Sequence, residues 1–332
     1  MDADSYLIKI KGLCTYFYTD EGTVRAVDGV DLKIDAGETL GVVGESGCGK
    51  SVTALSIMRL IPTPPGRITG GEILYREDKG KSIDLTRLDP WGSKMRSIRG
   101  GEIAMIFQEP MTSLNPVYTI GSQITEAIVT HQNITGKEAR EHATEMLDRV
   151  GIPAPEQRVN EYPHQLSGGM RQRAMIAMAL SCHPNLLVAD EPTTALDATV
   201  QAQVLELMKD LQQEFGMAIM MITHNLGVIA ETSDNVAVMY LGKIMEYGSA
   251  HDLFHNPMHP YLRALLESIP SLAGKGQRLA MIKGTVPDPL SIPQGCCFAP
   301  RCSYAKQICR QKDPAVIEAD KGHQVKCWLY SL

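Results

Sequence analysis

Gly44-Glu-Ser-Gly-Cys-Gly-Lys-Ser51 fits the phosphate-loop pattern G-x-x-x-x-G-K-[ST] at every position. The apolar residues 38–43 before it predict a strand, and the spacing of apolar residues over 51–60 predicts a helix. A glycine-rich turn between a strand and a helix lets backbone N–H groups converge on phosphate oxygens, and the helix N-terminus adds a partial positive charge. The stretch therefore predicts a nucleotide site in a P-loop α/β fold.

Single residues of the loop have separate expected roles. Lys50 should reach the β- and γ-phosphates, and Ser51 should ligate Mg²⁺. Cys48 has two interpretations: a small side chain that fills a small space, or a reactive thiol whose pKa is lowered at the helix N-terminus. The expected nucleotide-binding residues of the loop are Gly44, Glu45, Ser46, Gly47, Cys48, Gly49, Lys50 and Ser51.

Leu186-Leu-Val-Ala-Asp-Glu191 is an apolar strand that ends in two acids. Adjacent carboxylates at the end of a buried strand are costly unless a cation or a reaction uses them. Asp190 is expected to hold Mg²⁺, directly or through water, and Glu191 to orient and polarise an attacking water. Between the two motifs, Gln165-Leu-Ser-Gly-Gly-Met-Arg-Gln-Arg173 places a Ser-Gly-Gly turn before a helix, which predicts a second backbone anion site.

Strands alternate with helices over about residues 1–250, which predicts a mostly parallel sheet covered on both faces. Residues 7–10 and 30–34 alternate like antiparallel edge strands. The other expected strands are 102–107, 186–189, 218–223, 235–240 and 243–246, and the other expected helices lie within 119–149, 167–181 and 200–215. After about Gly248 this alternation stops and Pro, Gly and Cys become frequent, which predicts a second domain over residues 251–332.

Composition and the N-terminus limit the class of protein. The formal net charge of −6 gives no overall attraction for nucleic acid, so nucleic acid is not an expected partner. No apolar run approaches the roughly 18–20 residues that span a bilayer, and the start MDADSYLIKIKG is unlike a signal peptide. We therefore expect a cytosolic chain, in which disulfides are rare.

The phosphate loop, the Leu-Ser-Gly-Gly-Met signature and the Asp-Glu pair resemble, in order and spacing, the nucleotide-binding subunits of ABC transporters. Gln108 matches the family's glutamine loop, Ala195-Leu-Asp197 its dimer-interface loop, and His224 its switch histidine. The resemblance covers about residues 6–250. It implies an ABC cassette with a parallel-sheet core, an antiparallel β subdomain and an α-helical subdomain over about 109–175.

The resemblance also implies how the site is composed. Phe17, with Tyr16 and Tyr18 as close rivals, matches the aromatic residue that stacks on adenine. Two cassettes of this family pack head to tail, so ATP on one phosphate loop would meet the signature of the other. The implied catalytic residues are Glu191, His224 and Lys50, the Mg²⁺ ligands Ser51, Gln108 and Asp190, and the residues acting across the dimer Ser167, Gly168, Gly169 and Asp197.

Two residues depart from the family pattern. Met170 stands where many relatives have Gln, and Asn225 replaces the acid that usually follows the switch histidine. Since neither change touches Lys50 or Glu191, we expect a modest effect on the rate and no loss of activity.

Asn256-Pro-Met-His-Pro-Tyr-Leu-Arg-Ala-Leu265 and Met111-Thr-Ser-Leu-Asn-Pro116 are similar to the ATPases of oligopeptide and dipeptide importers. This resemblance implies an ATPase at the cytoplasmic face of the membrane that powers uptake of di- or oligopeptides. Its implied partners are two integral membrane permeases, a second ATPase subunit (a copy or a paralogue) and, indirectly, an extracytoplasmic peptide-binding protein. Import of a nickel chelate or glutathione is an alternative, as is a soluble ABC ATPase with a metal- or redox-sensing tail.

Four cysteines of the tail follow the pattern Cys296-x₅-Cys302-x₆-Cys309-x₁₇-Cys327. A tail with little hydrophobic core needs a cross-link to be stable. In a reducing compartment, a bound metal provides it better than a disulfide does. Structural zinc usually brings a short C-x₂₋₄-C pair, which is missing among these four, whereas thiolates on irregular loops suit a [4Fe–4S] cube. The resemblance to peptide-importer ATPases implies such a cluster on these four cysteines, with Cys297 as the spare. A zinc site and free or disulfide-bonded thiols remain as alternative interpretations of these cysteines.

Overall fold

The computed structural model describes residues 6–77, 80–108, 113–194, 196–268 and 282–331. The chain forms two compact units. The first is built mainly from Leu88–Ile222, and the second from Ile8–Ile34, Thr39–Arg87 and Thr223–Leu332. Ala195 and residues 109–112, which the sequence motifs include, lie outside the described residues.

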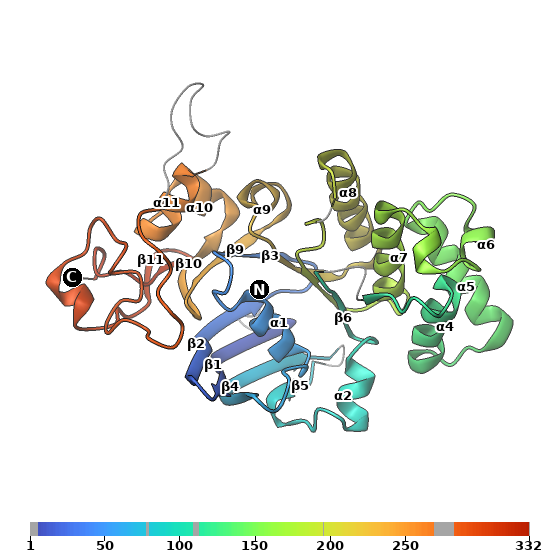
Figure 1. Ribbon diagram of the computed structural model, residues 1–332, viewed down its shortest axis with the longest axis horizontal. Helices are drawn as coiled ribbons and strands as arrows, with labels where there is room; N and C mark the ends of the chain where they lie inside the picture. The colour runs from blue at the N-terminus through green and yellow to red at the C-terminus, as the bar shows by residue number, and fades with distance from the viewer. Residues whose placement is uncertain (1–5, 78–79, 109–112, 195, 269–281, 332) are drawn as a thin grey trace. The chain divides into compact units, whose positions relative to one another are not determined.

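An antiparallel sheet with the order β2-β1-β4-β5 forms one part of the second unit (Figure 1). Its strands are β1 (Ile8–Thr19), β2 (Gly22–Ile34), β4 (Gly66–Arg76) and β5 (Ser82–Asp84). Ile8 pairs with Ile34, so the two expected antiparallel strands are confirmed, although both are much longer than predicted. Of these two, only β2 is an edge strand, because β1 also pairs with β4. Helix α1 (Lys50–Ile57) packs against β1, where the hydroxyls of Thr15 and Ser56 are hydrogen bonded at 2.9 Å.

Strand β4 is absent from the sequence prediction because the pair Gly70-Gly71 in its middle has the composition of a loop. The structure shows why glycine stands there. Gly71 has φ +87°, and a Cβ atom at this position would lie 2.5 Å from the carbonyl oxygen of Gly12 in β1. The glycine thus permits a close approach of two strands at an irregularity of the ladder.

A second set of strands in the same unit leads to the tail. Strand β3 (Thr39–Val43) runs parallel to β9 (Asn235–Tyr240), which pairs antiparallel with β10 (Lys243–Ser249). Beyond Ser249 the chain forms α10 (Ala250–His255), α11 (Pro260–Glu267), β11 (Ile317–Asp320) and β12 (His323–Val325). Strand β12 pairs with β10, so the segment after residue 250, predicted as a second domain, adds a strand beside β10.

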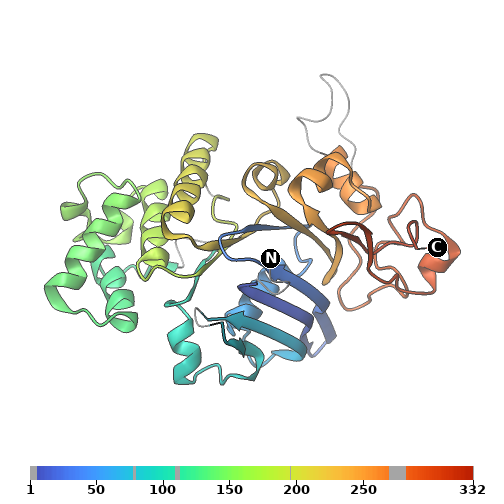
Figure 2. The same cartoon turned by 180° about the vertical axis from the view of Figure 1, so that it is seen from behind.

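The first unit contains three parallel strands in the order β8-β7-β6. These are β6 (Ile103–Ile106), β7 (Leu186–Asp190) and β8 (Ala218–Ile222), all within one or two residues of prediction. Helices α4 (Ile120–His131), α5 (Gly136–Arg149) and α7 (Gly168–Leu180) pack on one another, as Figure 2 shows from behind. The other α-helices among the described residues of this unit are α2 (Ser93–Ile98), α6 (Pro155–Arg158) and α8 (Ala198–Phe215).

The helices in the described segments differ from membrane-spanning helices in length or in composition. None of them combines the length and the apolar character needed to cross a membrane.

Candidate functional site

The phosphate loop, Gly44–Ser51, connects β3 to α1 as predicted. Gly49 has φ +105° and is the N-cap of α1. A Cβ atom at Gly49 would lie 2.2 Å from the carbonyl oxygen of Ala26, and one at Gly44 would lie 2.2 Å from that of Met239. Both contacts are shorter than any side chain tolerates, so the fold around the loop permits only glycine at these two positions.

Lys50 lies inside this loop and is only 6% exposed. Its ammonium donates to the carbonyl oxygens of Gly44 at 2.8 Å and Glu45 at 3.1 Å. Ser46 and Gly47 form the exposed part of the loop. The positive charge is thus held beneath an exposed turn of backbone at a helix N-terminus, an arrangement that attracts an anion.

Cys48 is buried in the same loop, with 3% of its surface exposed. Burial raises the pKa of its thiol, and the nearby Lys50 ammonium offsets this only in part. The interpretation as a reactive thiol of lowered pKa is therefore wrong, because removal from water outweighs the charge beside it. Cys48 instead fills a small space, as the first interpretation states.

Glu191 follows β7 and has a left-handed backbone, with φ +50°. Its N–H donates to the carbonyl oxygen of Ile222 at 2.8 Å, which fixes the turn. Its carboxylate accepts hydrogen bonds from the Gln108 amide at 3.0 Å and from the Thr194 hydroxyl at 2.8 Å. The neighbouring Asp190 is 5% exposed. Of the two acids held in this way at a strand end, Asp190 can act as a metal ligand. Glu191 can accept the proton of a water molecule.

Ser167 and Asp197 are the N-caps of α7 and α8. The Ser167 hydroxyl accepts from the N–H of Met170 at 3.3 Å, and the Asp197 carboxylate accepts from the N–H of Val200 at 3.0 Å. A Cβ atom at Gly169 would lie 3.1 Å from Val200, so the two helix N-termini are neighbours. Ser167, Gly168 and Asp197 are exposed, so they are accessible for the predicted contact with a second chain.

His224 is exposed and immediately precedes the N-cap of α9 (Leu226–Thr232). That N-cap is Asn225, whose side-chain oxygen accepts from the N–H groups of Gly227 at 3.0 Å and Val228 at 3.4 Å. Asn225 therefore performs the capping role for which an acid is also suited, without the negative charge.

Phe17 and its two rivals occupy different environments on β1. The Tyr16 hydroxyl donates to the Asp28 carboxylate at 2.6 Å, and burial together with this bond raises the pKa of Tyr16. Tyr18 is 51% exposed. Phe17 points to the same face of β1 as Thr15, which contacts α1, the helix that carries the phosphate loop. Phe17 therefore lies on the face of β1 against which α1 packs.

The tail supplies contacts at the phosphate loop that the sequence pattern did not predict. Arg301 forms an ion pair with Glu45, and the hydroxyl of Tyr261 accepts from the backbone N–H of Glu45. These residues are 256 and 216 positions from Glu45 along the chain, and no motif connects them. No signal in a single sequence could have identified either contact.

The eight cysteines are all free thiols. Among the described residues, no group of three or more His, Cys, Asp or Glu side chains converges on a point where one metal ion could bind. Burial raises the pKa of the Cys296 and Cys327 thiols, and the nearby Cys309 adds to this effect at both. Cys297 is different, because its thiol is 1% exposed and points to the carbonyl oxygen of Tyr240 at 3.9 Å.

Two protein-family models match this chain, one in its N-terminal part and one in its C-terminal part. Residues 27–194 match the model of the ABC transporter family, and residues 245–309 match that of the oligopeptide/dipeptide transporter C-terminal region. The oligopeptide transport ATP-binding protein AppD of Bacillus subtilis is 53% identical over 98% of this chain and 97% of its own. The chain belongs to the ATP-binding subunits of oligopeptide/dipeptide ABC transporters.

Other members and structures of the ABC family agree with this assignment. The dipeptide transport ATP-binding protein DppD of Bacillus subtilis is 49% identical over 97% of this chain and 94% of its own. The dimeric post-hydrolysis structure of the ATP-binding cassette MJ0796, bound to ADP and Pi, superimposes with a TM-score of 0.64 at 28% identity and covers 73% of this chain and 98% of that one. This subunit is therefore an ABC importer ATPase of the peptide transporter family, and the ATP-hydrolysing cassette expected from its motifs is confirmed.

Proposed function

We propose that this subunit powers the uptake of di- or oligopeptides from the cytoplasmic face of the membrane. The observation that carries the proposal is the match of residues 245–309 to the oligopeptide/dipeptide transporter C-terminal region, which general ABC cassettes do not require. Near-complete coverage of relatives that are named for peptide transport supports it. The proposed partners are two membrane permeases, a second ATPase subunit and, through the permeases, an extracytoplasmic peptide-binding protein.

ATP is proposed to bind between two cassettes. Phe17 would stack on adenine, the backbone and Lys50 of the phosphate loop would hold the phosphates, and Ser167 and Asp197 of the second cassette would complete the site. The exposed positions of Ser46, Gly47 and Ser167 support this arrangement, because the loop must be open to ATP and the signature must reach the ATP of the other cassette. The cassette MJ0796 is itself dimeric with ADP and Pi bound.

Ser51, Gln108 and Asp190 would hold Mg²⁺, which neutralises charge on the phosphates. Their donor set of one hydroxyl, one amide and one carboxylate fits the preference of this ion for oxygen ligands. Glu191, held by the Gln108 amide, would orient a water molecule and accept its proton. His224 would contact the γ-phosphate. Hydrolysis then releases the two cassettes, because the γ-phosphate no longer joins them.

An uptake assay tests the peptide assignment. The subunit would be purified with its permeases, reconstituted in vesicles with the binding protein, and offered labelled dipeptides, longer peptides, glutathione and a nickel chelate. We expect ATP-dependent accumulation of peptides, and none when Lys50→Ala replaces the wild-type chain. Accumulation of only glutathione or the nickel chelate would exclude peptides as the substrate, and ATP hydrolysis independent of the permeases would favour a soluble ATPase.

We further propose that Cys296, Cys302, Cys309 and Cys327 hold a [4Fe–4S] cluster. Burial, with the charges of Cys309 and Cys327 adding to it, raises the pKa of Cys296 to about 11, so a cation is needed to hold the thiolates together. A cube takes one thiolate at each of four corners, whereas zinc needs its ligands around one point. The four cysteines lack the short C-x₂₋₄-C pair that structural zinc usually brings, which favours the cube.

Iron, sulfide and zinc analysis of anaerobically purified protein decides between the metals. We expect four irons per chain and a broad absorbance near 400 nm in the wild-type protein, about zero iron in Cys302→Ser, and wild-type iron in the matched control Cys297→Ser. Stoichiometric zinc, or loss of iron in Cys297→Ser alone, would contradict the assignment.

A further inference from the structure

Glu45, the second residue of the phosphate loop, is held on three sides within the second unit. Its backbone N–H donates to the Tyr261 hydroxyl at 2.9 Å, and its carbonyl oxygen accepts from Lys50 at 3.1 Å. Its carboxylate receives both terminal nitrogens of Arg301, at 2.6 Å and 3.0 Å. No other residue of the loop combines these backbone and side-chain contacts among the bonds described for this part of the chain.

Arg301 belongs to the tail and is fixed by its surroundings. Its guanidinium donates to the Tyr240 hydroxyl at 3.3 Å and, through Nε, to the carbonyl oxygen of Lys283 at 3.2 Å. Its own N–H donates to the carbonyl oxygen of Phe298 at 3.0 Å. Its side chain is 4% exposed, and that of Glu45 is 25% exposed. The pair is therefore largely removed from water and weakly screened.

A carboxylate beside a phosphate loop opposes the binding of a polyanion, since like charges at short range in a protein repel. The paired guanidinium cancels this charge and fixes the carboxylate in a fork-to-fork geometry. Removing one member of a buried pair leaves the other charge uncompensated, which is more harmful than removing both. ATP affinity should therefore depend on Arg301, and this dependence should disappear when Glu45 is also neutral.

We propose that Arg301 is a positioning residue of the nucleotide site, which acts through Glu45 and makes the tail part of the ATP-binding machinery. This inference rests on the proposed binding of ATP at the phosphate loop and deepens it. Arg301 directly precedes Cys302, and the turn that holds it begins at Cys296, whose carbonyl oxygen accepts from Ala299 at 2.9 Å. Any change that opens this turn would also displace the guanidinium from the phosphate loop.

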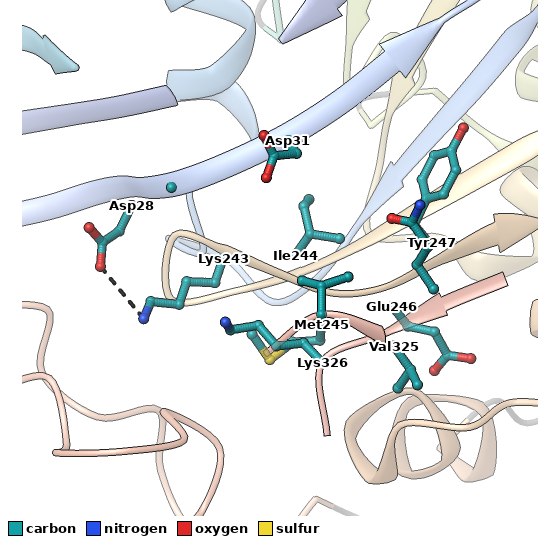
Figure 3. A pocket seen from close by; sticks show the side chains of 12 residues that line it. Asp28, Asp31, Lys243, Ile244, Met245, Glu246, Tyr247, Val325 and Lys326 are labelled. Carbon is teal, nitrogen blue, oxygen red and sulfur yellow. Dashed lines mark ion pairs between the residues drawn. The ribbon is translucent and has the colours of Figure 1, made fainter. Parts of the chain in front are cut away.

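A second charged anchor of the tail provides a matched control. Asp313 accepts from Lys243 of β10 at 2.7 Å and from Lys326 at 3.1 Å. Lys243 also faces Asp28 at 3.7 Å, beside a cavity of about 90 Å³ (Figure 3). No contact described for Asp313 reaches the phosphate loop. Asp313→Asn should therefore loosen the tail without changing the charge at the nucleotide site.

The experiment compares ATP affinity and turnover of the full-length subunit assembled with its permeases. We expect Arg301→Gln to raise KM for ATP roughly tenfold, a ratio that corresponds to about 1.4 kcal/mol, with a smaller change in kcat. Arg301→Lys keeps the charge but loses the bidentate fork, so its KM should lie between those of wild type and Arg301→Gln. The double variant Glu45→Gln/Arg301→Gln should recover most of the lost affinity, and Asp313→Asn should keep KM within about twofold.

Thermal unfolding of each variant shows whether it is folded. If Arg301→Gln does not fold, the KM of Arg301→Lys still tests whether the fork to Glu45 affects ATP affinity. A wild-type KM in Arg301→Gln would overturn the inference. A double variant as weak as Arg301→Gln would overturn it as well, since that result means a purely structural tail contact. A wild-type subunit that fails to bind ATP would refute the proposed function instead, and Lys50→Ala gives the baseline for that outcome.

Discussion

The side-chain amide of Gln108 donates to the carboxylate of Glu191 across 3.0 Å, although the two residues are 83 positions apart in the sequence. The glutamine comes just after β6 and the glutamate just after β7, and these parallel strands are adjacent. The carboxyl ends of neighbouring parallel strands meet at one edge of a sheet, which is where ligands bind in α/β folds. The contact thus ties the expected glutamine loop to the expected hydrolytic carboxylate.

Glu191→Gln should abolish turnover while ATP binding remains. An amide cannot accept the proton of the attacking water, and loss of a general base lowers rates by about 10²–10⁴-fold. Steady-state hydrolysis and ATP titration of the same preparation measure the two effects. Gln108→Ala removes a donor to the carboxylate and a proposed Mg²⁺ ligand but leaves the general base, so it should have a smaller effect on kcat. Normal hydrolysis by Glu191→Gln would remove this residue from the catalytic role.

Gly49→Ala should destabilise the fold more than Gly47→Ala. Both residues have positive φ, at +105° and +77°, but only a Cβ at Gly49 would collide, at 2.2 Å from the Ala26 carbonyl oxygen. A Cβ at Gly47 has nothing within 4 Å, so its cost is the backbone strain of about 1–2 kcal/mol. Denaturant unfolding of the two variants gives the difference, and equal losses of stability would contradict the steric argument.

Asn225→Asp should leave the stability of the subunit unchanged or slightly higher, because aspartate caps a helix as well as asparagine does. Asn225→Ala removes the acceptor for Gly227 and Val228 and should cost about 1 kcal/mol. Thermal unfolding separates these two outcomes. ATPase assays of Asn225→Asp then measure the effect of the charge alone, which we expect to be modest. A large stability difference between Asn225→Asp and wild type would show that capping is not the role of this side chain.

His259 should make the subunit acid-sensitive. Its ring is 1% exposed and caps α11 by accepting from the N–H of Tyr261 at 3.0 Å. Burial, with the charge of Arg263 adding to it, lowers the pKa of His259 from 6.5 to about 3. Its contribution to stability is therefore complete above pH 6.5 and is lost as the pH falls from there towards 3.

Denaturant unfolding of His259→Asn across this pH range tests the linkage. Asparagine keeps an N-cap acceptor but does not titrate, so the loss of stability on acidification should be shallower by up to about 1.4 kcal/mol per pH unit. The Glu246 carboxylate, which accepts from the His259 backbone at 2.7 Å, remains in both proteins. Parallel pH profiles for wild type and His259→Asn would contradict a buried neutral histidine.

Local patterns predicted the parts of the fold that depend on local physics. Strands β6, β7 and β8 are apolar runs of about five residues, and α7 and α8 begin at Ser167 and Asp197, which are strong capping residues. The phosphate loop was predictable because its glycines and lysine perform their roles within eight consecutive residues.

Features that depend on distant residues could not be predicted in this way. Strand β4 depends on Gly12 of β1, which approaches Gly71 closely. The ion pair of Glu45 depends on Arg301, and the raised pKa of Cys48 depends on the burial that the folded core provides. In each case the deciding partner lies outside the window in which a pattern can be recognised.

Strand β12 pairs with β10 through Glu246 opposite Val325 and Tyr247 opposite Gln324. Glu246 is 1% exposed, and its carboxylate meets His323 at 2.7 Å. Exchange of tails between paralogous subunits at residue 250 would give β10 a foreign neighbour and the buried carboxylate a foreign partner. We therefore expect a chimera joined at that point to be less stable than either parent, because a buried carboxylate without its partner is costly.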